Sequence, residues 1–136
     1  MNNAATTPIF ATEYDRSACQ VGVVHLGFGA FHRAHQAVYI DDYMACSNDL
    51  RWGIAAVNLR GSESAHFDAA VADIDTHDGY HLKSFSSGGE VALRRVRPHV
   101  HFKDWSIAPT ESEALLAKES VHLVTITVTE SGYYTD

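Results

Sequence analysis

The sequence is poor in cysteine, lysine and long apolar runs, and each shortage excludes a class of protein. The two cysteines, Cys19 and Cys46, have the spacing of neither a metal site nor a redox motif, so we expect no disulfide framework and a reducing, cytoplasmic location. No apolar run approaches the roughly 20 residues that span a bilayer, and the N-terminus lacks the basic start and apolar core of a signal peptide. We therefore expect a cytoplasmic protein with no membrane partner.

Positive charge is scarce as well. Three lysines and a formal net charge of −7 leave no clustered positive surface to neutralise phosphates, which argues against a nucleic-acid partner. The basic residues from Arg94 to Arg97 alternate around Val96, as is typical of an exposed strand edge. The 136 residues, 46% hydrophobic and 20% charged, suit one globular domain with a real core.

A short apolar run followed by two glycines is the most informative stretch of the chain. Val21–Leu26 has the composition of a parallel strand buried on both faces, and a helical pattern begins after the second glycine. Glycines at such a turn let the main chain approach a pyrophosphate, and the helix offers unpaired N–H groups. We expect His32 and Arg33 to add donors and positive potential, so the predicted cofactor-binding residues of the turn are Gly27, Phe28, Gly29, Ala30, Phe31, His32 and Arg33.

The generic dinucleotide fingerprint has a third glycine, whose position His32 occupies in this chain. Because the third glycine provides close packing of helix on strand, its absence weakens the pattern. Taken alone, the stretch fits an ordinary tight strand-to-helix turn better than it fits a nucleotide site.

The helix predicted after the turn carries two apolar stripes. The first runs from Ala30 to Ala45 with one interruption at Asp41 and is expected to pack on the sheet. The second consists of Tyr39, Ile40 and Tyr43. This second stripe either meets something outside the 136 residues or is covered by residues 1–20.

Three stretches together give a family resemblance. Gly27–Gln36 reads GFGAFHRAHQ, Trp52–Ile54 leads to Asn58–Arg60, and Thr125–Tyr133 reads TITVTESGY. In sequence, order and separation they resemble the N-terminal domain of the mannitol dehydrogenase family, the long-chain, metal-independent polyol and hexuronate dehydrogenases, fructuronate reductase among them. The resemblance covers about residues 21 to 134 and makes the missing third glycine a family feature.

The resemblance implies an NAD-dependent oxidoreductase of carbohydrate metabolism, which passes hydride between nicotinamide and C2 of a polyol or sugar acid of the mannitol/fructose or mannonate/fructuronate type. It also implies that Glu130 supports catalysis by passing protons between the base and solvent, with Thr129 beside it among the cofactor-binding residues. The structural alternative is that Glu130 is a loop carboxylate that caps a neighbour. In the family, the catalytic lysine and its asparagine and histidine partners lie in a helical C-terminal domain. We therefore expect residues 1–20 to form an arm, residues 21–136 an incomplete dinucleotide-binding domain, and the chain alone to be inactive.

An acid follows the second predicted strand, Trp52–Asn58. In dinucleotide folds a carboxylate at this place accepts hydrogen bonds from the adenosine ribose hydroxyls, and Glu63 is the first candidate. A carboxylate would repel a 2′-phosphate, so NAD is favoured over NADP, although the neighbouring Arg60 could accommodate the phosphate. The structural alternative is that Glu63 complements a helix dipole.

The remaining pattern predicts an α/β fold, a Rossmann-like, mostly parallel sheet with helices on both faces and an antiparallel hairpin insertion. Ser86–Gly89 is a strong local signal for the hairpin turn. Thr110 and Glu113 have capping-box spacing at the start of a helix. The other predicted elements are a helix over Ser64–Asp73, hairpin strands over Tyr80–Phe85 and Glu90–Val96, a short strand over Val100–Phe102, a helix ending near Lys118 and a strand over Val121–Val128.

Other functions fit parts of the pattern less well. His32 with His35, and His99 with His101, are pairs without an obvious third ligand, so no metal is expected. An S-adenosylmethionine-dependent methyltransferase also has a glycine turn and an acid after its second strand, but the strand before Gly27 contains no Asp or Glu. A non-catalytic nucleotide-binding module stays open, because no catalytic base is visible.

Overall fold

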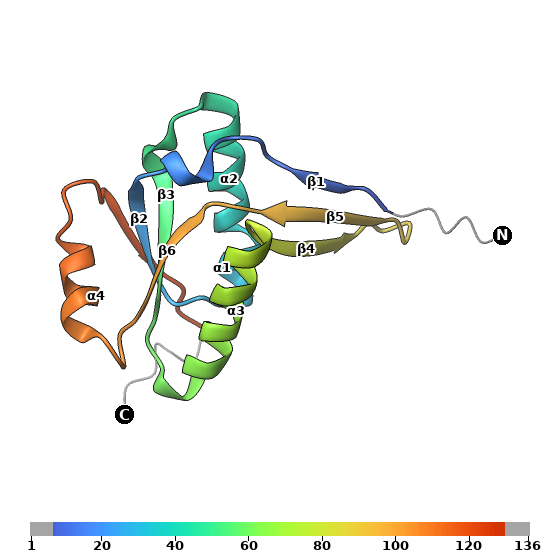
Figure 1. Cartoon of the computed structure of the whole chain (residues 1–136). Helices are drawn as coiled ribbons and strands as arrows, with labels where there is room; N and C mark the ends of the chain where they lie inside the picture. The colour runs from blue at the N-terminus through green and yellow to red at the C-terminus, as the bar shows by residue number, and fades with distance from the viewer. Residues whose placement is uncertain (1–6, 130–136) are drawn as a thin grey trace.

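The body of the molecule is a four-stranded parallel sheet with the strand order β6-β3-β2-β7 (Figure 1). The computed structural model describes residues 7–129. The sheet strands are β2 (Val21–Leu26), β3 (Gly53–Asn58), β6 (His99–Asp104) and β7 (Leu123–Ile126). Numbered as they occur along the chain, these four strands lie in the order 3-2-1-4, which is the first part of the Rossmann order and places a topological switch point at β2. The predicted fold class is confirmed.

Helical connections cover both faces of this sheet. Val23 and Ile54 face α2 and α3 and belong to one apolar cluster, whereas Val24, Ala55 and Val57 face α4 and belong to another. Adjacent residues, Val23 and Val24 in β2 and Ile54 and Ala55 in β3, thus enter different cores, as the two-residue period of a strand requires. The connections are α1 (Ala30–Ala34), α2 (Gln36–Ser47), η2 (Leu50–Trp52), η3 (Gly61–Glu63), α3 (Ser64–His77) and α4 (Pro109–Leu116).

A second, three-stranded sheet projects from the body (Figure 1). Its hairpin strands β4 (Tyr80–Phe85) and β5 (Val91–Val96) are antiparallel, so the predicted hairpin insertion is confirmed. β1 (Ile9–Ala11) adds to β5 in parallel, so part of the N-terminal segment is a strand. β5 is therefore the central strand of this sheet.

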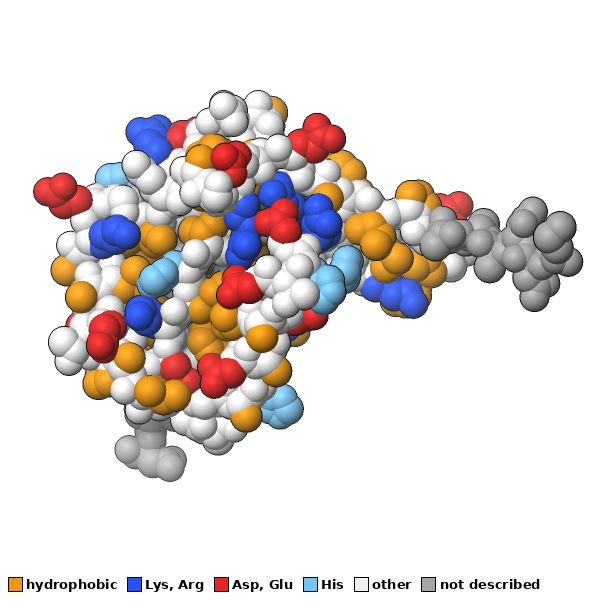
Figure 2. All heavy atoms as spheres, viewed as in Figure 1, with side chains coloured by type: hydrophobic (Ala, Val, Ile, Leu, Met, Phe, Trp, Pro, Cys, Tyr) orange, Lys and Arg blue, Asp and Glu red, His pale blue; other side chains and the backbone are white. Residues whose placement is uncertain are grey.

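The prediction that Arg94 to Arg97 form an exposed edge is wrong. Arg97 is 7% exposed, and its guanidinium donates to the carbonyls of Thr12 and Tyr14 at 2.7 and 3.0 Å and to Asp78 at 2.8 Å. Arginine and acidic side chains lie side by side where the projecting strands join the body (Figure 2). The basic run holds the N-terminal segment in place, which strand alternation alone does not reveal.

The single helix predicted after the glycine turn is two helices. His35, with φ −122° and ψ −79°, ends α1 and begins α2, and α1 is only five residues long. Since the helix dipole grows from aligned peptide units, the turn is followed by a much weaker dipole than a continuous helix would supply. Asp41 is not a gap in the apolar face, because it is fully buried and accepts hydrogen bonds from Thr12 and Tyr14.

The second stripe of the helix is largely exposed. Tyr39 is 73% exposed and Tyr43 51%, so residues 7–20 do not cover them, whereas Ile40 packs on the core.

The start of α4 also differs from the prediction. It begins at Pro109, with Ala108 as its N-cap, because proline is pre-organised for the first helical position, and no side-chain cap forms at Thr110. None of the helices within residues 7–129 is long and apolar enough to cross a membrane.

Candidate functional site

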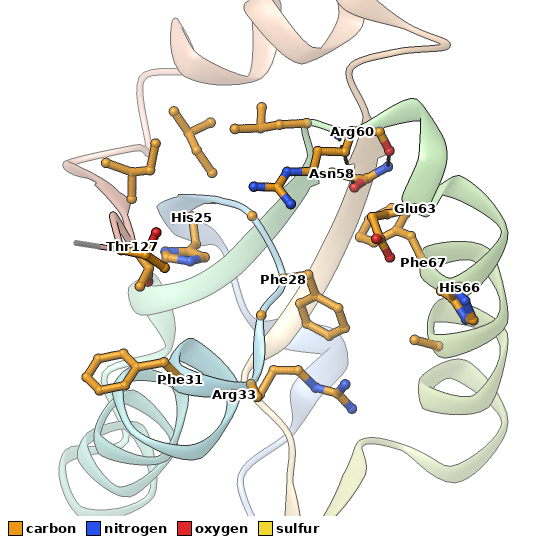
Figure 3. Close-up of a pocket in the computed structure, with 18 residues that line it drawn as sticks. His25, Phe28, Phe31, Arg33, Asn58, Arg60, Glu63, His66, Phe67 and Thr127 are labelled. Carbon is orange, nitrogen blue, oxygen red and sulfur yellow. Dashed lines mark hydrogen bonds between the residues drawn. The ribbon is translucent and has the colours of Figure 1, made fainter. Parts of the chain in front are cut away.

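A pocket of about 590 Å³ opens at the carboxyl ends of β2, β3 and β7 (Figure 3). This is the edge of a parallel sheet at which ligands bind, beside the switch point. Glu63, His66 and Phe67 lie at one end of the pocket and His25 and Thr127 at the other, with Phe28 and Arg33 between them (Figure 3). The pocket is lined by His25, Leu26, Gly27, Phe28, Gly29, Ala30, Phe31, Arg33, Asn58, Leu59, Arg60, Glu63, His66, Phe67, Ala70, Ile126, Thr127 and Thr129.

The two glycines of the turn have different roles. Gly27 has φ +122°, a conformation that side chains rarely adopt, and its N–H donates to the carbonyl of Val57 at 2.7 Å. Gly29 has φ −83°, which any residue can adopt, and a Cβ placed there would have no heavy atom of the described chain within 4 Å. The fold therefore requires a glycine at Gly27 but not at Gly29, which lines the pocket and has open space at the position of a Cβ.

Arg33 supplies a fixed positive charge at the middle of the pocket. Its guanidinium lies 4.8 Å from the ring centroid of Phe28 and 4.6 Å from that of Tyr80. Two such cation–π contacts limit the motion of the side chain. The Tyr80 hydroxyl donates to the Arg33 carbonyl, and burial raises the pKa of Tyr80 well above its usual range, so this hydroxyl stays protonated.

A hydrogen-bonded loop positions the acidic end of the pocket. The side chain of Asn58, the last residue of β3, donates to the carbonyl of Arg60 at 2.8 Å and to the carboxylate of Asp104 at 3.1 Å. The loop then turns into η3, which places Glu63 directly before α3 with its side chain exposed. Glu63 makes no side-chain capping bond to α3, so its carboxylate faces the pocket without a helix-cap contact in the described structure.

His25 lies at the opposite end of the pocket, beside β7. It is 2% exposed, and its Nδ1 is 2.7 Å from the hydroxyl of Thr125. Burial, and secondarily the neighbouring His32, lowers the pKa of His25 to about 4, so the ring is neutral at pH 7.

The structure brings together most of the residues that the sequence predicted for the site. Gly27, Phe28, Gly29, Ala30, Phe31, Arg33, Glu63 and Thr129 all line the pocket. His32 does not: its ring is 1% exposed and bonded to Gln36 and His99, so it gives the pocket no side-chain donor. Helical spacing turns this ring toward the sheet. Glu130 lies outside the described residues.

Sequence reasoning missed His25, Asn58, His66 and Phe67 as pocket residues. A signal for His25 existed, because it is a polar residue within an otherwise apolar buried strand. Asn58 carried a similar signal as the polar last residue of β3. His66 and Phe67 lie on α3 and gave no signal, because only the tertiary packing turns this part of α3 to the pocket. Within residues 7–129, no group of three or more His, Cys, Asp and Glu side chains has a geometry that could hold a metal ion.

Comparisons with known proteins agree with this geometry. The family model of the mannitol dehydrogenase Rossmann domain matches residues 21–135. Mannitol 2-dehydrogenase of Cereibacter sphaeroides is 36% identical over 141 aligned positions, covering 100% of this chain and 27% of the relative. The enzyme of the same name from Pyricularia oryzae is 34% identical, covering 89% of this chain and 23% of the relative.

Two solved structures resemble the chain in three dimensions. Substrate-free D-sorbitol dehydrogenase superposes with a TM-score of 0.80 at 27% identity, over 92% of this chain and 25% of that one. Pseudomonas fluorescens mannitol 2-dehydrogenase, in a ternary complex with NAD and D-mannitol, gives a TM-score of 0.77 at 27% identity over the same shares. The chain thus spans about a quarter of the length of the relatives it matches. On the match to its Rossmann domain and on these relatives, the chain belongs to the mannitol dehydrogenase family.

Proposed function

We propose that the pocket binds NAD and that the chain is the cofactor-binding part of a polyol or sugar-acid dehydrogenase. The observation that carries the proposal is Gly29, a residue that lines the pocket and at which a Cβ would have no heavy atom of the described chain within 4 Å. A glycine that the fold does not need leaves room for a ligand to contact the main chain. The solved relative with NAD and D-mannitol supports the same ligand.

The residues of the pocket fit the parts of a dinucleotide. The main chain of Gly27–Gly29 would hold the pyrophosphate, with the Arg33 guanidinium as the nearby cation. Glu63 would accept hydrogen bonds from the adenosine ribose hydroxyls and would repel a 2′-phosphate, so we propose NAD rather than NADP. Phe28, Ala30, Phe31 and Thr129 would complete the walls. When bound, NAD supplies the hydride acceptor of the reaction.

The substrate and the catalytic base belong to a part of the protein beyond these residues. Because the chain spans about a quarter of its relatives, we propose that residues 21–136 are the N-terminal dinucleotide-binding domain of a longer enzyme, preceded by an arm over residues 1–20. A C-terminal domain would supply the base and the pocket for a polyol or sugar acid, of the mannitol or mannonate type. Glu130 is proposed to pass protons between that base and solvent, so Glu130→Gln in the complete enzyme should change its pH profile.

Calorimetric titration of the 136-residue chain with NAD, NADP and S-adenosylmethionine tests the proposal. We expect binding of NAD, weaker binding of NADP and none of S-adenosylmethionine. Gly29→Ala should weaken NAD binding by tenfold or more without loss of stability, because the added methyl group meets ligand and not protein.

The matched control is Gly88→Ala in the β4–β5 turn, where a Cβ also meets little, the hydroxyl oxygen of Ser86 at 3.8 Å. This change should alter neither stability nor NAD affinity. Equal NAD affinity of Gly29→Ala and the unaltered chain would contradict the proposal, and turnover of a polyol by the chain alone would contradict the division into two domains.

A further inference from the structure

Five side chains form a continuous hydrogen-bonded series beneath the pocket. His25 Nδ1 is 2.7 Å from Thr125 Oγ1, which is 3.2 Å from Gln36 Oε1. The same Gln36 oxygen is 2.8 Å from His32 Nδ1, and His32 Nε2 is 2.8 Å from His99 Nε2. The series therefore runs from β2 through β7, α2 and α1 to β6, and His25 is its end at the pocket.

The position of every proton in the series follows from Gln36. Its Oε1 can only accept, so both the Thr125 hydroxyl and His32 Nδ1–H donate to it. Because the Thr125 proton is used in this bond, Thr125 Oγ1 must accept from His25 Nδ1–H. A neutral imidazole carries one proton, so His25 Nε2 carries a lone pair.

The far end of the series agrees with this direction. His32 Nε2 is unprotonated and accepts from His99 Nε2–H, which leaves His99 Nδ1 as a buried acceptor with no partner among the described residues. The reverse direction would leave a buried N–H without an acceptor, and orphaned donors are rarer in proteins than under-satisfied acceptors. Burial lowers the pKa of both His32 and His99, so both rings are neutral at pH 7.

The ring of His25 is also fixed in orientation. It stacks on His32 with ring centroids 3.7 Å apart and planes 6° apart, so it cannot rotate without displacing a buried neighbour. Nε2 lies toward the turn, since it is the His25 atom nearest to the position of a Cβ on Gly27, at 3.7 Å. Within residues 7–129 this nitrogen makes no hydrogen bond, and His25 lines the pocket.

We propose that this series locks His25 as the Nδ1–H tautomer and that His25 Nε2 accepts a hydrogen bond from a neutral donor on the nicotinamide half of the cofactor, either the carboxamide N–H or a ribose hydroxyl. The inference rests on the proposed function for its ligand. His25 lies at the end of the pocket opposite Glu63, which is assigned to the adenosine half (Figure 3). A neutral acceptor suits that place, because a protonated imidazole would repel the positively charged nicotinamide ring.

The tautomer is measured without any ligand. Nitrogen-15 NMR of the histidine rings in the 136-residue chain at pH 7 should show His25 protonated at Nδ1 and bare at Nε2. Thr125→Val removes the acceptor of Nδ1–H while preserving side-chain shape, and it should move His25 toward the Nε2–H form. A chain in which His25 is protonated at Nε2 would overturn the proposal whatever the chain binds.

The acceptor role is measured with ligands that differ in one half. NAD should shift the His25 Nε2 signal and ADP should not, because ADP lacks the nicotinamide nucleoside. ADP-ribose retains the ribose hydroxyls and 3-acetylpyridine adenine dinucleotide lacks the amide N–H. If ADP-ribose shifts the His25 Nε2 signal, the donor is a ribose hydroxyl. If neither ADP-ribose nor the acetylpyridine dinucleotide shifts this signal, the donor is the carboxamide N–H.

His25→Asn retains a donor near Thr125 but lacks Nε2. It should weaken NAD binding about three- to tenfold, the effect of one hydrogen bond, and leave ADP binding unchanged. His81→Asn on the projecting hairpin is the matched control and should change neither. If ADP and NAD bind but affect His25 equally, the acceptor role is wrong and the nucleotide site stands. If no nucleotide binds, both the proposed function and the acceptor role of His25 are wrong. The tautomer of His25 is still tested in that case, because its measurement uses no ligand.

Discussion

The guanidinium of Arg94 lies 2.8 Å from the carboxylate of Asp41, a residue with no exposed surface. The same guanidinium nitrogen lies 2.6 Å from Asp42, whose side chain is 53% exposed. Asp41 Oδ1 also accepts from Thr12 and Tyr14, so this one carboxylate connects the N-terminal segment, α2 and β5. Arg94 thus pairs with two adjacent carboxylates, of which Asp41 is buried and Asp42 is exposed.

Asp41→Asn should destabilise the chain far more than Asp42→Asn. Asparagine can still accept from Thr12 and Tyr14, but its amide nitrogen then faces the Arg94 guanidinium, and the buried charge pair is lost. We expect a cost of about 2–4 kcal/mol for Asp41→Asn and less than about 1 kcal/mol for Asp42→Asn. Urea unfolding of both variants measures the difference, and equal costs would show that the buried pair does not hold the N-terminal segment.

Stability should fall as the pH falls from 7 toward 4. Burial lowers the pKa of His25 to about 4 and also lowers those of His32 and His99, whereas in the unfolded chain they titrate near 6.5. In this window the unfolded chain binds more protons than the folded chain, so the free energy of unfolding rises with pH. The stabilisation is complete above the histidine pKa of the unfolded chain, and it is lost as the pH falls toward the histidine pKa of the folded chain. His25 alone should contribute about 2–3 kcal/mol.

Urea unfolding at several pH values between 5 and 7 measures this dependence. His25→Asn should reduce the slope of the unfolding free energy against pH, because a residue that titrates only in the unfolded chain has been removed. The exposed His81 makes the matched control, and His81→Asn should leave the slope unchanged. A slope unaffected by His25→Asn would mean that His25 binds protons equally in the folded and unfolded chains.

Local sequence signals predict the parts of the fold whose partners are near in the chain. The bounds of β2 match the predicted strand, because its apolar run ends directly at Gly27, which has a positive φ. The β4–β5 hairpin is equally visible, because Ser86–Gly89 determines its turn locally. The glycine turn is local in the same sense, since strand, glycines and helix follow one another directly, and the sequence alone therefore predicts a ligand site there.

The signals that failed depend on distant partners. Arg97 is buried because it meets the carbonyl of Tyr14, 83 positions away, and no alternation of residue types contains that information. Asp41 interrupts an apolar stripe in the sequence, and only the fold supplies its donors, Thr12 and Tyr14. His32 likewise lies beneath the pocket because His99, 67 positions away, receives its ring. The part of the candidate site at the glycine turn is therefore predictable from the sequence. The end of the pocket at His25 is not, because its position depends on how the strands pair in the sheet.

Glu63→Gln should weaken NAD binding about tenfold and reduce the preference for NAD over NADP. The amide still accepts a hydrogen bond from a ribose hydroxyl, but it lacks the charge that strengthens such a bond and repels a 2′-phosphate. Calorimetric titration with both dinucleotides gives the two affinities. Glu113→Gln, an exposed carboxylate on α4 that does not line the pocket, is the control. An unchanged NAD/NADP ratio would remove Glu63 from the ribose site.

Tyr39 and Tyr80 should respond to substitution in opposite ways. Tyr39 is 73% exposed, so Tyr39→Ser should change the stability of the 136-residue chain by less than about 0.5 kcal/mol. Tyr80 is 3% exposed and supports Arg33 through its ring and its hydroxyl, so Tyr80→Ser should cost about 3–5 kcal/mol, and Tyr80→Phe, which loses only the hydrogen bond, about 1 kcal/mol. Thermal and urea unfolding measure all three. A large loss of stability for Tyr39→Ser would show that this face is covered in solution. A small loss in the 136-residue chain, together with a substantial loss in a longer form of the protein, would show that Tyr39 and Tyr43 pack against residues outside the 136.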